Sequence, residues 1–527
     1  MRRVFSILVL LLFATGITFA GGAQETEKSK TVASDVKVGE PKIGGDLRLV
    51  WEPMNTLDVH WTGNDAVWEV GCHIWETPLA LDDSSNPIPM LTDYEFKDDN
   101  KTIILKVRKG VKFHNGDTLM ADDVIASFNR WMTRATFGKA AFKDLTAVEK
   151  IDDYTVAIKL SQPSPTALIA LAYPDQGPYI MPEEVIKEAG NGEIKQYIGT
   201  GPYKLDQWIP DRHIRLVRFN EYSSLPGEPN GNGGAKKQYL DSITFVNIND
   251  PMTRIQALMS NDCQAGVFPI PSIEQLTMVP NIIISPTGEY SSESITINMK
   301  SKFMSDLNMR KAVLYALNQT EIMYGACAAR EDMYSTVPSW GTTGSIYEST
   351  TGKDVYNKQD IAKAKEYLEK TGYNGEPLVM YTNGSYETDK NAAMVVAQEL
   401  RTIGLNIDFR APDWPTVVEA RQDPKAFDMI VSGYAMKPDP TLLAFTSIGW
   451  PGWWETDKRM DLYYQLLEET DTAKRAMIWN DFTGLIWSEL PVIKLGDFYG
   501  AIGYLKNVHN IPVNYPWRRF YWNTWME

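Results

Sequence analysis

Residues Leu91–Arg130 read LTDYEFKDDNKTIILKVRKGVKFHNGDTLMADDVIASFNR and hold the clearest local patterns in the chain. Thr102–Arg108 is rich in β-forming residues, and its later part alternates apolar and charged side chains. This alternation predicts a strand with one buried face. Lys109-Gly110 and Asn115-Gly116 predict turns, because such pairs tolerate the backbone angles of tight hairpins.

A helix is predicted directly after this hairpin. Val124–Phe128 carries apolar residues at helical spacing. Asp122 or Asp123 is expected to be its N-cap or a first-turn residue, since a carboxylate there accepts hydrogen bonds from free amides. These local patterns alone predict a hairpin followed by a helix and do not indicate a function.

The first twenty residues have the layout of a secretory signal. Arg2 and Arg3 precede an apolar run, Val4–Phe13, and then small residues. The run is too short to span a bilayer, so we expect a signal that is cleaved after Ala20 or, alternatively, after Ala23. No cysteine lies in this segment or just after it, so lipid attachment lacks its acceptor and a periplasmic location is expected.

The composition indicates a large acidic protein. The chain has 527 residues and a formal charge of −15, without basic clusters. This length predicts two or more lobes, and the charge argues against nucleic-acid binding. The three cysteines, Cys72, Cys263 and Cys327, allow either one disulfide with a free thiol or three buried free thiols.

The region from about residue 294 to 490 is predicted to be an α/β lobe. Asp360 is expected to cap a helix that is followed by a strand, Leu378–Tyr381. A second helix should end at Gly404 and lead into another strand, Leu405–Phe409. Strands that alternate with helices through short connections predict a βαβ unit with parallel pairing.

Three further segments carry local signals. Asp250-Pro251 predicts a helix start with an aspartate cap and proline at the first helical position. Asp206–Asp211 is expected to be a longer loop between two strands of a hairpin. Glu228–Lys237 is rich in Gly, Asn and Pro and is expected to be a surface loop.

The segment Leu105–Trp131, LKVRKGVKFHNGDTLMADDVIASFNRW, resembles the signature of the family 5 extracellular solute-binding proteins, the oligopeptide, dipeptide and nickel binders of ABC importers. Five later segments resemble the same family in the expected order. They are Gly199–Tyr203 with Asn220–Tyr222, Met309–Leu317, Ala362–Tyr373, Ile403–Asp408 and Pro438–Pro440.

The resemblance implies an α/β fold, a two-lobed periplasmic binding protein of type II-like architecture. The resemblance also implies that the protein falls in the cluster of large binding proteins, which have an inserted subdomain and a hinge between the lobes. The chain should cross between the lobes near Glu289 and near Val492. The expected boundaries are a signal (1–20), a flexible leader (21–41), lobe I (42–61), an inserted subdomain of lobe I (62–188), lobe I again (189–289), lobe II (290–491) and a return to lobe I (492–527).

The sequence carries few signals of chemistry. The five histidines do not form a spacing typical of metal sites, and no nucleophile elbow, P-loop or Ser-x-x-Lys motif is present. We therefore expect no catalytic residue, no metal and no cofactor.

Ser432–Met436 matches the strand that runs beside the ligand backbone in peptide-binding relatives, so Gly433, Tyr434 and Ala435 are predicted ligand contacts. An extended peptide can add to such an edge through main-chain hydrogen bonds. Relatives place an aspartate just after this strand to pair with the ligand's ammonium group. Here Asp439 comes later, and it is either that partner or a turn residue before Pro440.

Aromatic residues are the other candidates for ligand contact. Trp450-Pro-Gly-Trp453-Trp454 is unusually dense in tryptophan, and Trp61 lies near the chain's first strand. Such rings either stack on a ligand or pack in the core. The resemblance also aligns residues 62–65 with a cleft segment of the first lobe, so Asp65 is a second acidic candidate.

The sequence therefore predicts a monomeric substrate-binding protein of an ABC importer that closes around a solute and hands it to the membrane permease. Short peptides are the expected ligand, and an oligosaccharide is the alternative within the same family. A secreted hydrolase of glycans or peptides is the alternative from another class, and it requires two converging acid–base groups or a metal.

Overall fold

The computed structural model describes residues 39–62, 64–513 and 519–527. The predicted signal and most of the predicted leader lie outside these residues. Pro41–Glu527 groups into one compact unit. In the described residues, every helix is too short or too polar to cross a membrane.

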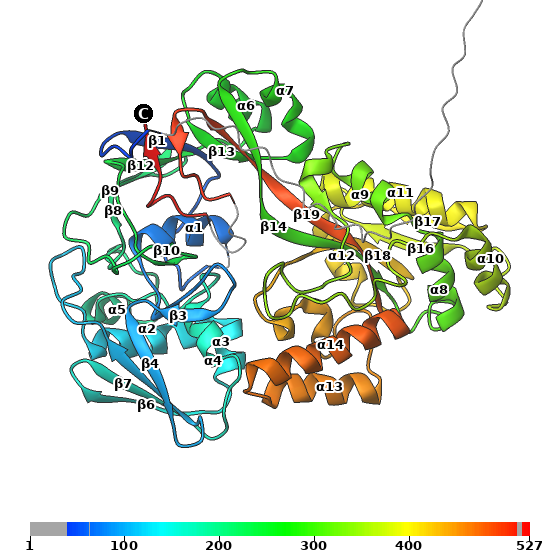
Figure 1. The fold of residues 1–527 in the computed structure, drawn as a ribbon, viewed down its shortest axis with the longest axis horizontal. Helices are drawn as coiled ribbons and strands as arrows, with labels where there is room; N and C mark the ends of the chain where they lie inside the picture. Colours follow the sequence, from blue (N-terminus) through cyan, green and yellow to red (C-terminus); the bar gives the residue numbers. More distant parts are fainter. Residues whose placement is uncertain (1–38, 63, 514–518) are drawn as a thin grey trace, which may run out of the picture. The chain divides into compact units, whose positions relative to one another are not determined.

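An eleven-stranded sheet extends through this unit (Figure 1). The strand order is β17-β16-β18-β14-β19-β13-β1-β12-β9-β8, and β15 pairs with β19. We assign β1, β8, β9, β12 and β13 to lobe I and β16, β17 and β18 to lobe II. The bounds are β1 (Asp46–Trp51), β8 (Tyr203–Ile209), β9 (His213–Arg218), β12 (Ser242–Asn247), β13 (Ala265–Phe268), β14 (Ile282–Ile297), β15 (Tyr334–Ser335), β16 (Leu378–Thr382), β17 (Ile407–Arg410), β18 (Met429–Ala435) and β19 (Val492–Leu505).

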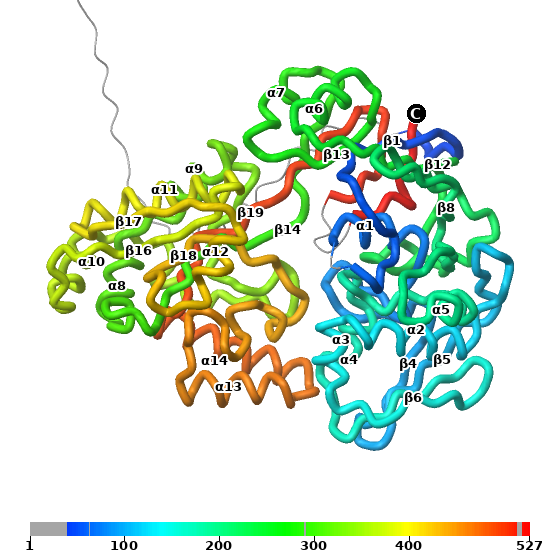
Figure 2. The backbone as a smooth tube through the Cα atoms, turned by 180° about the vertical axis from the view of Figure 1, so that it is seen from behind, coloured from blue at the N-terminus to red at the C-terminus, as the bar shows by residue number. Residues whose placement is uncertain are grey.

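The long strands β14 and β19 connect the two lobes. They pair with each other over most of their length. Residues 501–504 of β19 also pair with β13 of lobe I, whereas residues 291–297 of β14 pair with β18 of lobe II. The β14–β19 pair is therefore flanked by β13, next to β19, in lobe I and by β18, next to β14, in lobe II. Figure 2 shows the two strands running between the two sets of helices.

We propose that the hinge lies where the strand that flanks this pair changes from β13 to β18. The β14–β19 register is irregular between Pro286 and Ser291, around the predicted crossing at Glu289. On β19 this change falls between Phe498, which pairs with the lobe II part of β14, and Ala501, where the pairing with β13 begins. It lies later in the chain than the predicted crossing at Val492. The difference arises because β19 first runs along β14 within lobe II, and a sequence pattern cannot show where a continuous strand changes its neighbours.

The inserted subdomain has its own four-stranded sheet, of order β4-β5-β7-β6. Leu105, Phe128 and Trp131 belong to its separate apolar core. The bounds are β2 (Leu79–Leu81), β3 (Pro87–Pro89), β4 (Thr92–Lys97), β5 (Thr102–Val107), β6 (Leu145–Asp152), β7 (Thr155–Leu160), α2 (Ala121–Arg134), α3 (Thr136–Ala141), α4 (Ala167–Ala172) and α5 (Glu183–Ala189). Helix α1 (Asp65–Ile74) falls within the predicted range 62–188 but packs into the main core, with residues of lobe I such as Leu47 and Phe245.

The structure confirms the local predictions for this subdomain. β5 begins at Thr102, and a bridge between Lys112 and Thr118 closes the Asn115-Gly116 turn. Helix α2 follows with Asp122 and Asp123 in its first turn. The Asp123 carboxylate accepts hydrogen bonds from the amides of Met120 and Glu183, both at 2.9 Å. Asp123 thus satisfies free amides at the starts of two helices.

Lobe II contains the predicted βαβ unit, in which β16 and β17 pair in parallel and α11 connects them. Asp360 caps α10 by accepting a hydrogen bond from the Lys363 amide at 2.9 Å. The lobe II helices are α8 (Leu307–Ala316), α9 (Gln319–Ala326), α10 (Ile361–Glu369), α11 (Glu387–Thr402), α12 (Trp414–Ala420), α13 (Asp457–Glu468) and α14 (Thr472–Glu489).

The remaining elements lie in lobe I. Asp250 caps α6 as predicted, accepting from the Thr253 amide at 2.8 Å. The bounds are α6 (Pro251–Met259), α7 (Glu274–Thr277), β10 (Pro229–Asn230), β11 (Gly233–Gly234), β20 (Val508–His509) and β21 (Trp525–Met526). Cys72, Cys263 and Cys327 are all buried, and among the described residues no disulfide joins any two of them, which fits the alternative of three buried thiols.

Two loop predictions were wrong. β8 extends to Ile209 and β9 begins at His213, so the connection is a tight turn rather than a longer loop; Asp211, with φ of 60°, makes the reversal. Glu228–Lys237 is not a surface loop throughout, because Asn232 and Lys236 are buried.

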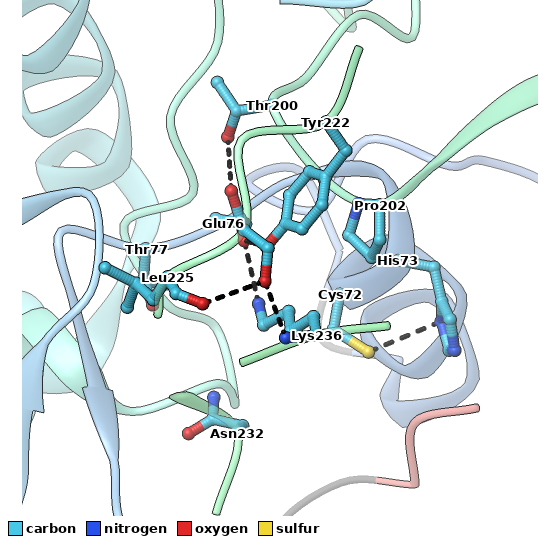
Figure 3. Close-up of polar contacts among 12 residues, drawn as sticks. Cys72, His73, Glu76, Thr77, Thr200, Pro202, Tyr222, Leu225, Asn232 and Lys236 are labelled. Carbon is cyan, nitrogen blue, oxygen red and sulfur yellow. Dashed lines mark hydrogen bonds and ion pairs between the residues drawn. The ribbon is translucent and has the colours of Figure 1, made fainter. Parts of the chain in front are cut away.

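The buried ion pair of Lys236 explains that second difference. Its ammonium group lies 2.9 Å from the carboxylate of buried Glu76, just after α1 (Figure 3). Tyr222 and Thr200 also donate hydrogen bonds to this carboxylate, at 2.7 and 3.0 Å. A buried charge is tolerated when such partners surround it, so the loop closes over Glu76.

Candidate functional site

One edge of β18 is open beside the hinge strands. On one side, Met429–Ala435 pairs with β14 along its whole length. On the other side, the β16 pairing ends at Val431. Among the described residues, no strand pairs with the outer edge of Ser432–Ala435. An extended main chain can add to such an edge.

The predicted contacts Gly433, Tyr434 and Ala435 occupy this edge, and they differ in what they present. The Tyr434 side chain is buried in lobe II and shares a short hydrogen bond with the Thr296 hydroxyl. A Cβ at Gly433 would fall 2.6 Å from the Ser291 hydroxyl oxygen, so the position has no room for a side chain. Ala435 is exposed. The main chain, rather than side chains, is what this edge offers a ligand.

Two buried carboxyl groups lie against this edge. The Gly433 amide faces the Asp389 carboxylate, and the buried carboxyl group of Glu293 on β14 lies close enough to Asp389 for each group to affect the pKa of the other. Burial raises the pKa of Asp389 to about 7 and raises the pKa of Glu293 well above its ordinary value. Within the described residues, neither carboxyl group forms an ion pair with a lysine or arginine that would offset the cost of its burial.

The structure places Asp439 in an internal role. Its side chain is fully buried, and one carboxylate oxygen lies 2.6 Å from the Arg475 guanidinium and accepts from the Tyr347 hydroxyl at 3.2 Å. The other oxygen accepts from the amide and hydroxyl of Thr441. Both carboxylate oxygens therefore have partners within lobe II, as expected if Asp439 is a turn residue.

The residues between Ala435 and Asp439 contact the inserted subdomain instead. Met436 packs into the apolar core of that subdomain. The Lys437 ammonium donates to the Tyr173 hydroxyl at 3.2 Å and lies 3.9 Å from the Asp175 carboxylate. A lysine therefore joins lobe II to the inserted subdomain at the position where the resemblance implied an aspartate.

The predicted tryptophans pack within their own lobes. Trp450 contacts the Tyr434 ring at 5.8 Å, and Trp453 contacts the Phe427 ring at the same distance. The pocket that both line is only about 10 Å³, which is the room of roughly one water molecule. Trp61 lies under the Arg134 guanidinium, 3.4 Å from the ring centre. These contacts fit the packing alternative.

Asp65 is exposed in the first turn of α1. The amide oxygen of Asn64 caps this helix by accepting from the Ala66 amide at 2.8 Å. The structure therefore gives Asp65 a place at a helix start, where a carboxylate is stabilised by the helix dipole. It does not join the group of residues around the β18 edge.

A pocket of about 300 Å³ lies between the inserted subdomain and lobe II. Sequence reasoning missed it, because its walls come from segments that are far apart in the chain and carry no motif. Its lining is Ser84, Ser85, Asn86, Pro87, Tyr94, Phe96, Asn100, Ser164, Pro165, Leu168, Ile169, Ser345, Ile346, Tyr347, Pro438, Thr470, Thr472 and Arg475.

No metal or catalytic site stands out beside these features. Among the described residues, no group of three or more His, Cys, Asp or Glu side chains is placed to hold a metal ion. The carboxyl groups of Glu293 and Asp389 are both buried and do not face solvent.

Comparison with known proteins places the chain in a family. Residues 86–450 match the model of the bacterial extracellular solute-binding proteins, family 5. The glutathione-binding protein GsiB of Escherichia coli is 28% identical over 425 residues, covering 76% of this chain and 78% of GsiB. A protein of Sinorhizobium fredii, named "Probable peptide ABC transporter periplasmic-binding protein y4tO", is 24% identical over 467 residues, covering 84% of this chain and 87% of that protein.

Solved structures share the fold. The ABC transporter substrate binding protein CtaP from Listeria monocytogenes superposes with a TM-score of 0.80 at 21% identity, covering 92% of this chain and 100% of CtaP. The oligopeptide-binding protein AppA from Bacillus subtilis, solved with a nonapeptide, gives a TM-score of 0.71 at 21% identity, with coverage of 93% and 100%. The two-lobed α/β architecture predicted from the sequence is thereby confirmed.

Proposed function

Because the chain belongs to the bacterial extracellular solute-binding proteins of family 5, we propose that it is the substrate-binding protein of an ABC importer and captures a short peptide or a similar small solute. The names of the relatives support this proposal, since they include peptide-binding and glutathione-binding proteins. The observation that carries it is the open main-chain edge of β18 beside the two strands that connect the lobes.

The geometry suggests how a ligand binds. The amides of alternate residues on a strand point to the same side, so the Ala435 amide faces the same edge as that of Gly433. The main chain of a peptide adds there through hydrogen bonds that do not depend on its side chains. Rotation at the hinge between the lobes then encloses the ligand, and exclusion of water strengthens each polar contact.

The proposal extends to location and partners. A binding protein of this kind works outside the cytoplasmic membrane, after removal of residues 1–20, and delivers its ligand to a membrane permease. It does so as a monomer and needs neither a cofactor nor a catalytic residue, since no bond is broken. Binding a nucleic acid is not part of this function, in keeping with the charge of −15.

One experiment distinguishes the proposed peptide-binding protein from the two alternatives, a sugar-binding protein and a hydrolase. Purified protein is incubated with pooled short peptides and pooled oligosaccharides, and bound and free molecules are identified by mass spectrometry. We expect peptides to be recovered intact from the protein fraction. Recovery of oligosaccharides alone would instead favour the sugar-binding alternative, and steady accumulation of cleaved products would replace the proposal with a hydrolase.

A further inference from the structure

The pocket between the inserted subdomain and lobe II differs chemically from the β18 edge. Both lobes contribute to it: Tyr94 and Phe96 come from β4, whereas Ile346 and Arg475 come from lobe II. Its volume of about 300 Å³ falls at the lower end of small-molecule sites, which span roughly 300–1,000 Å³. Pro438 also lines it, three residues beyond the end of β18, so the pocket adjoins the chain that leaves the open edge.

Two large apolar side chains face water in this pocket, one from each wall. Phe96 is 39% exposed and Ile346 is 42% exposed. The Tyr94 ring lies edge-on to the Phe96 ring, with the centres 6.1 Å apart. Single exposed apolar residues are common, but two on opposite walls of one pocket provide surface that a ligand can bury. An aromatic ring suits the flat, weakly polar face of a sugar ring.

The polar part of the lining carries no free charge. It consists of hydroxyl and amide side chains, and no Asp, Glu or Lys contributes to it. The uncharged polar residues are Ser84, Ser85, Asn86, Asn100, Ser164, Ser345, Thr470 and Thr472. These groups both donate and accept hydrogen bonds, as sugar hydroxyls do.

The one charged residue in the lining is already neutralised. The Arg475 guanidinium lies 2.6 Å from the Asp439 carboxylate, and its Nε donates to the Tyr347 hydroxyl at 3.0 Å. Its remaining nitrogen donates to the Leu466 carbonyl. An anionic ligand would have to displace Asp439, and a cationic ligand would find no carboxylate in the wall, so the pocket selects against both charges.

We propose that this pocket binds an uncharged, hydroxyl-bearing solute the size of a neutral mono- or disaccharide. The inference rests on the proposed function, because a ligand held by both lobes stabilises the closed state of a binding protein. It names a class of ligand for the outer part of the same cleft and leaves the β18 edge to main-chain recognition.

Calorimetric titration with matched sugars tests the proposal. The probes are glucose, maltose and cellobiose, compared with glucosamine and glucuronic acid, which add one positive or one negative charge to the same ring. At least one neutral sugar is expected to bind about tenfold or more tightly than either charged analogue, a difference set by the cost of burying an unpaired charge. Equal affinity for charged and neutral sugars, or no binding of any neutral sugar, overturns the proposal.

Substitutions locate the binding. Thr470→Trp fills the pocket from its exposed rim, and Phe96→Ala removes the ring; each is expected to weaken neutral-sugar binding about tenfold or more. Ile151→Ser, at an exposed apolar residue on β6 outside the pocket, is the matched control and should leave affinity unchanged. Thermal unfolding of all three variants verifies that they fold. Unchanged sugar affinity in both pocket variants rejects this location.

The same preparation separates this inference from the proposed function. Peptide binding is measured in parallel, with and without the neutral sugar. Peptide binding without sugar binding rejects the pocket proposal and leaves the transport function standing. If neither peptides nor sugars bind, or if either is cleaved, the proposed function itself fails.

Discussion

Several buried charges in this protein are held by partners from other segments of the chain, whereas Lys494 pairs with Asp497 three residues away. Asp439 pairs with Arg475, Glu76 pairs with Lys236, and the buried carboxyl groups of Glu293 and Asp389 lie close together. Removing one partner leaves the other buried without compensation, which is more costly than never having had the pair. A substitution in one of these pairs is therefore expected to lower the free energy of unfolding, which distinguishes it from a substitution that weakens only ligand binding.

Asp439→Asn is expected to lower the free energy of unfolding by about 3–5 kcal/mol, because Arg475 then stays buried without its counterion. Urea unfolding measures the loss. The double variant Asp439→Asn with Arg475→Met removes both charges and should recover part of the stability. If Asp439→Asn instead weakens peptide binding while its unfolding curve matches that of the wild type, Asp439 belongs to the ligand site after all.

The Glu293–Asp389 pair should make stability depend on pH. Burial raises both pKa values, and that of Asp389 reaches about 7. A group whose pKa is raised by folding contributes stability below its unfolded value, near 4, and this contribution is lost as pH rises toward 7. Glu293→Gln removes one of the two titrating carboxyl groups and keeps the shape of the side chain. Relative to this variant, the wild type should lose at most about 1.4 kcal/mol per pH unit between pH 4 and 7.

The comparison with the variant is needed because other groups titrate in the same range. Asp123 and Glu399, with pKa values raised to about 6 and 7, change stability in the same direction. Burial lowers the pKa of His60 and of His73 to about 4, so their contribution changes in the opposite direction. These groups are common to both proteins and cancel in the difference. Parallel pH profiles of urea unfolding for the two proteins would show that Glu293 does not have the raised pKa expected here.

At the scale of elements, the open edge of β18 makes a prediction about main-chain recognition. Ala435→Pro removes the amide that faces the edge, whereas Ala435→Gly keeps it. Loss of one hydrogen bond is worth about 0.5–1.5 kcal/mol, so the proline variant should bind a short peptide roughly two- to tenfold more weakly. Calorimetric titration of both variants measures this. Equal affinity of the proline and glycine variants would place the ligand elsewhere.

Local signals predicted elements well and long-range partners poorly. Asp250 and Asp360 cap helices as their positions in the sequence indicate, because a cap is decided within a few residues. The partner of Asp439 could not be predicted in this way. Arg475 lies in a different helix, and nothing in the local pattern separates a free carboxylate from a paired one. Asp439 itself caps the short 3-10 helix that begins at Pro440.

The pocket between the inserted subdomain and lobe II could not be predicted from the sequence either, because its walls come from distant segments. Tyr94 and Ile346 are separated by most of lobe I, and only the folded chain brings them to one cavity. Trp450 and Trp453 were candidate ligand contacts because tryptophan is unusually frequent in residues 450–454. In the structure, both contact neighbouring aromatic rings of lobe II. Residue type predicts the capacity to bind a ligand, and packing decides whether that capacity is used.

At the scale of the whole molecule, Lys437 is a contact between lobe II and the inserted subdomain. Its ammonium group is partly exposed and meets Tyr173 and Asp175. Such contacts are worth about 0.2–1 kcal/mol, so Lys437→Met should shift the ligand-free protein toward the open state by up to about fivefold. Small-angle scattering should then show a larger radius of gyration.

Lys302→Met is the matched control, because Lys302 forms an exposed ion pair with Glu376 inside lobe II. Its radius of gyration should equal that of the wild type. Peptide at saturating concentration should bring all three proteins to the same compact state. A ligand-free Lys437→Met protein as compact as the wild type would show that this contact does not affect the opening of the lobes.

The position of β19 in the chain sets the order in which this protein can be assembled. The strand Val492–Leu505 lies between β13 and β14, yet it follows both of them in the chain, with the helices and strands of lobe II in between. Until it arrives, β13 and β14 have no shared neighbour, and the backbone groups that β19 will satisfy stay bonded to water. A nascent chain that ends before residue 492 therefore cannot complete its central sheet, and contacts between such distant segments make that final step slow.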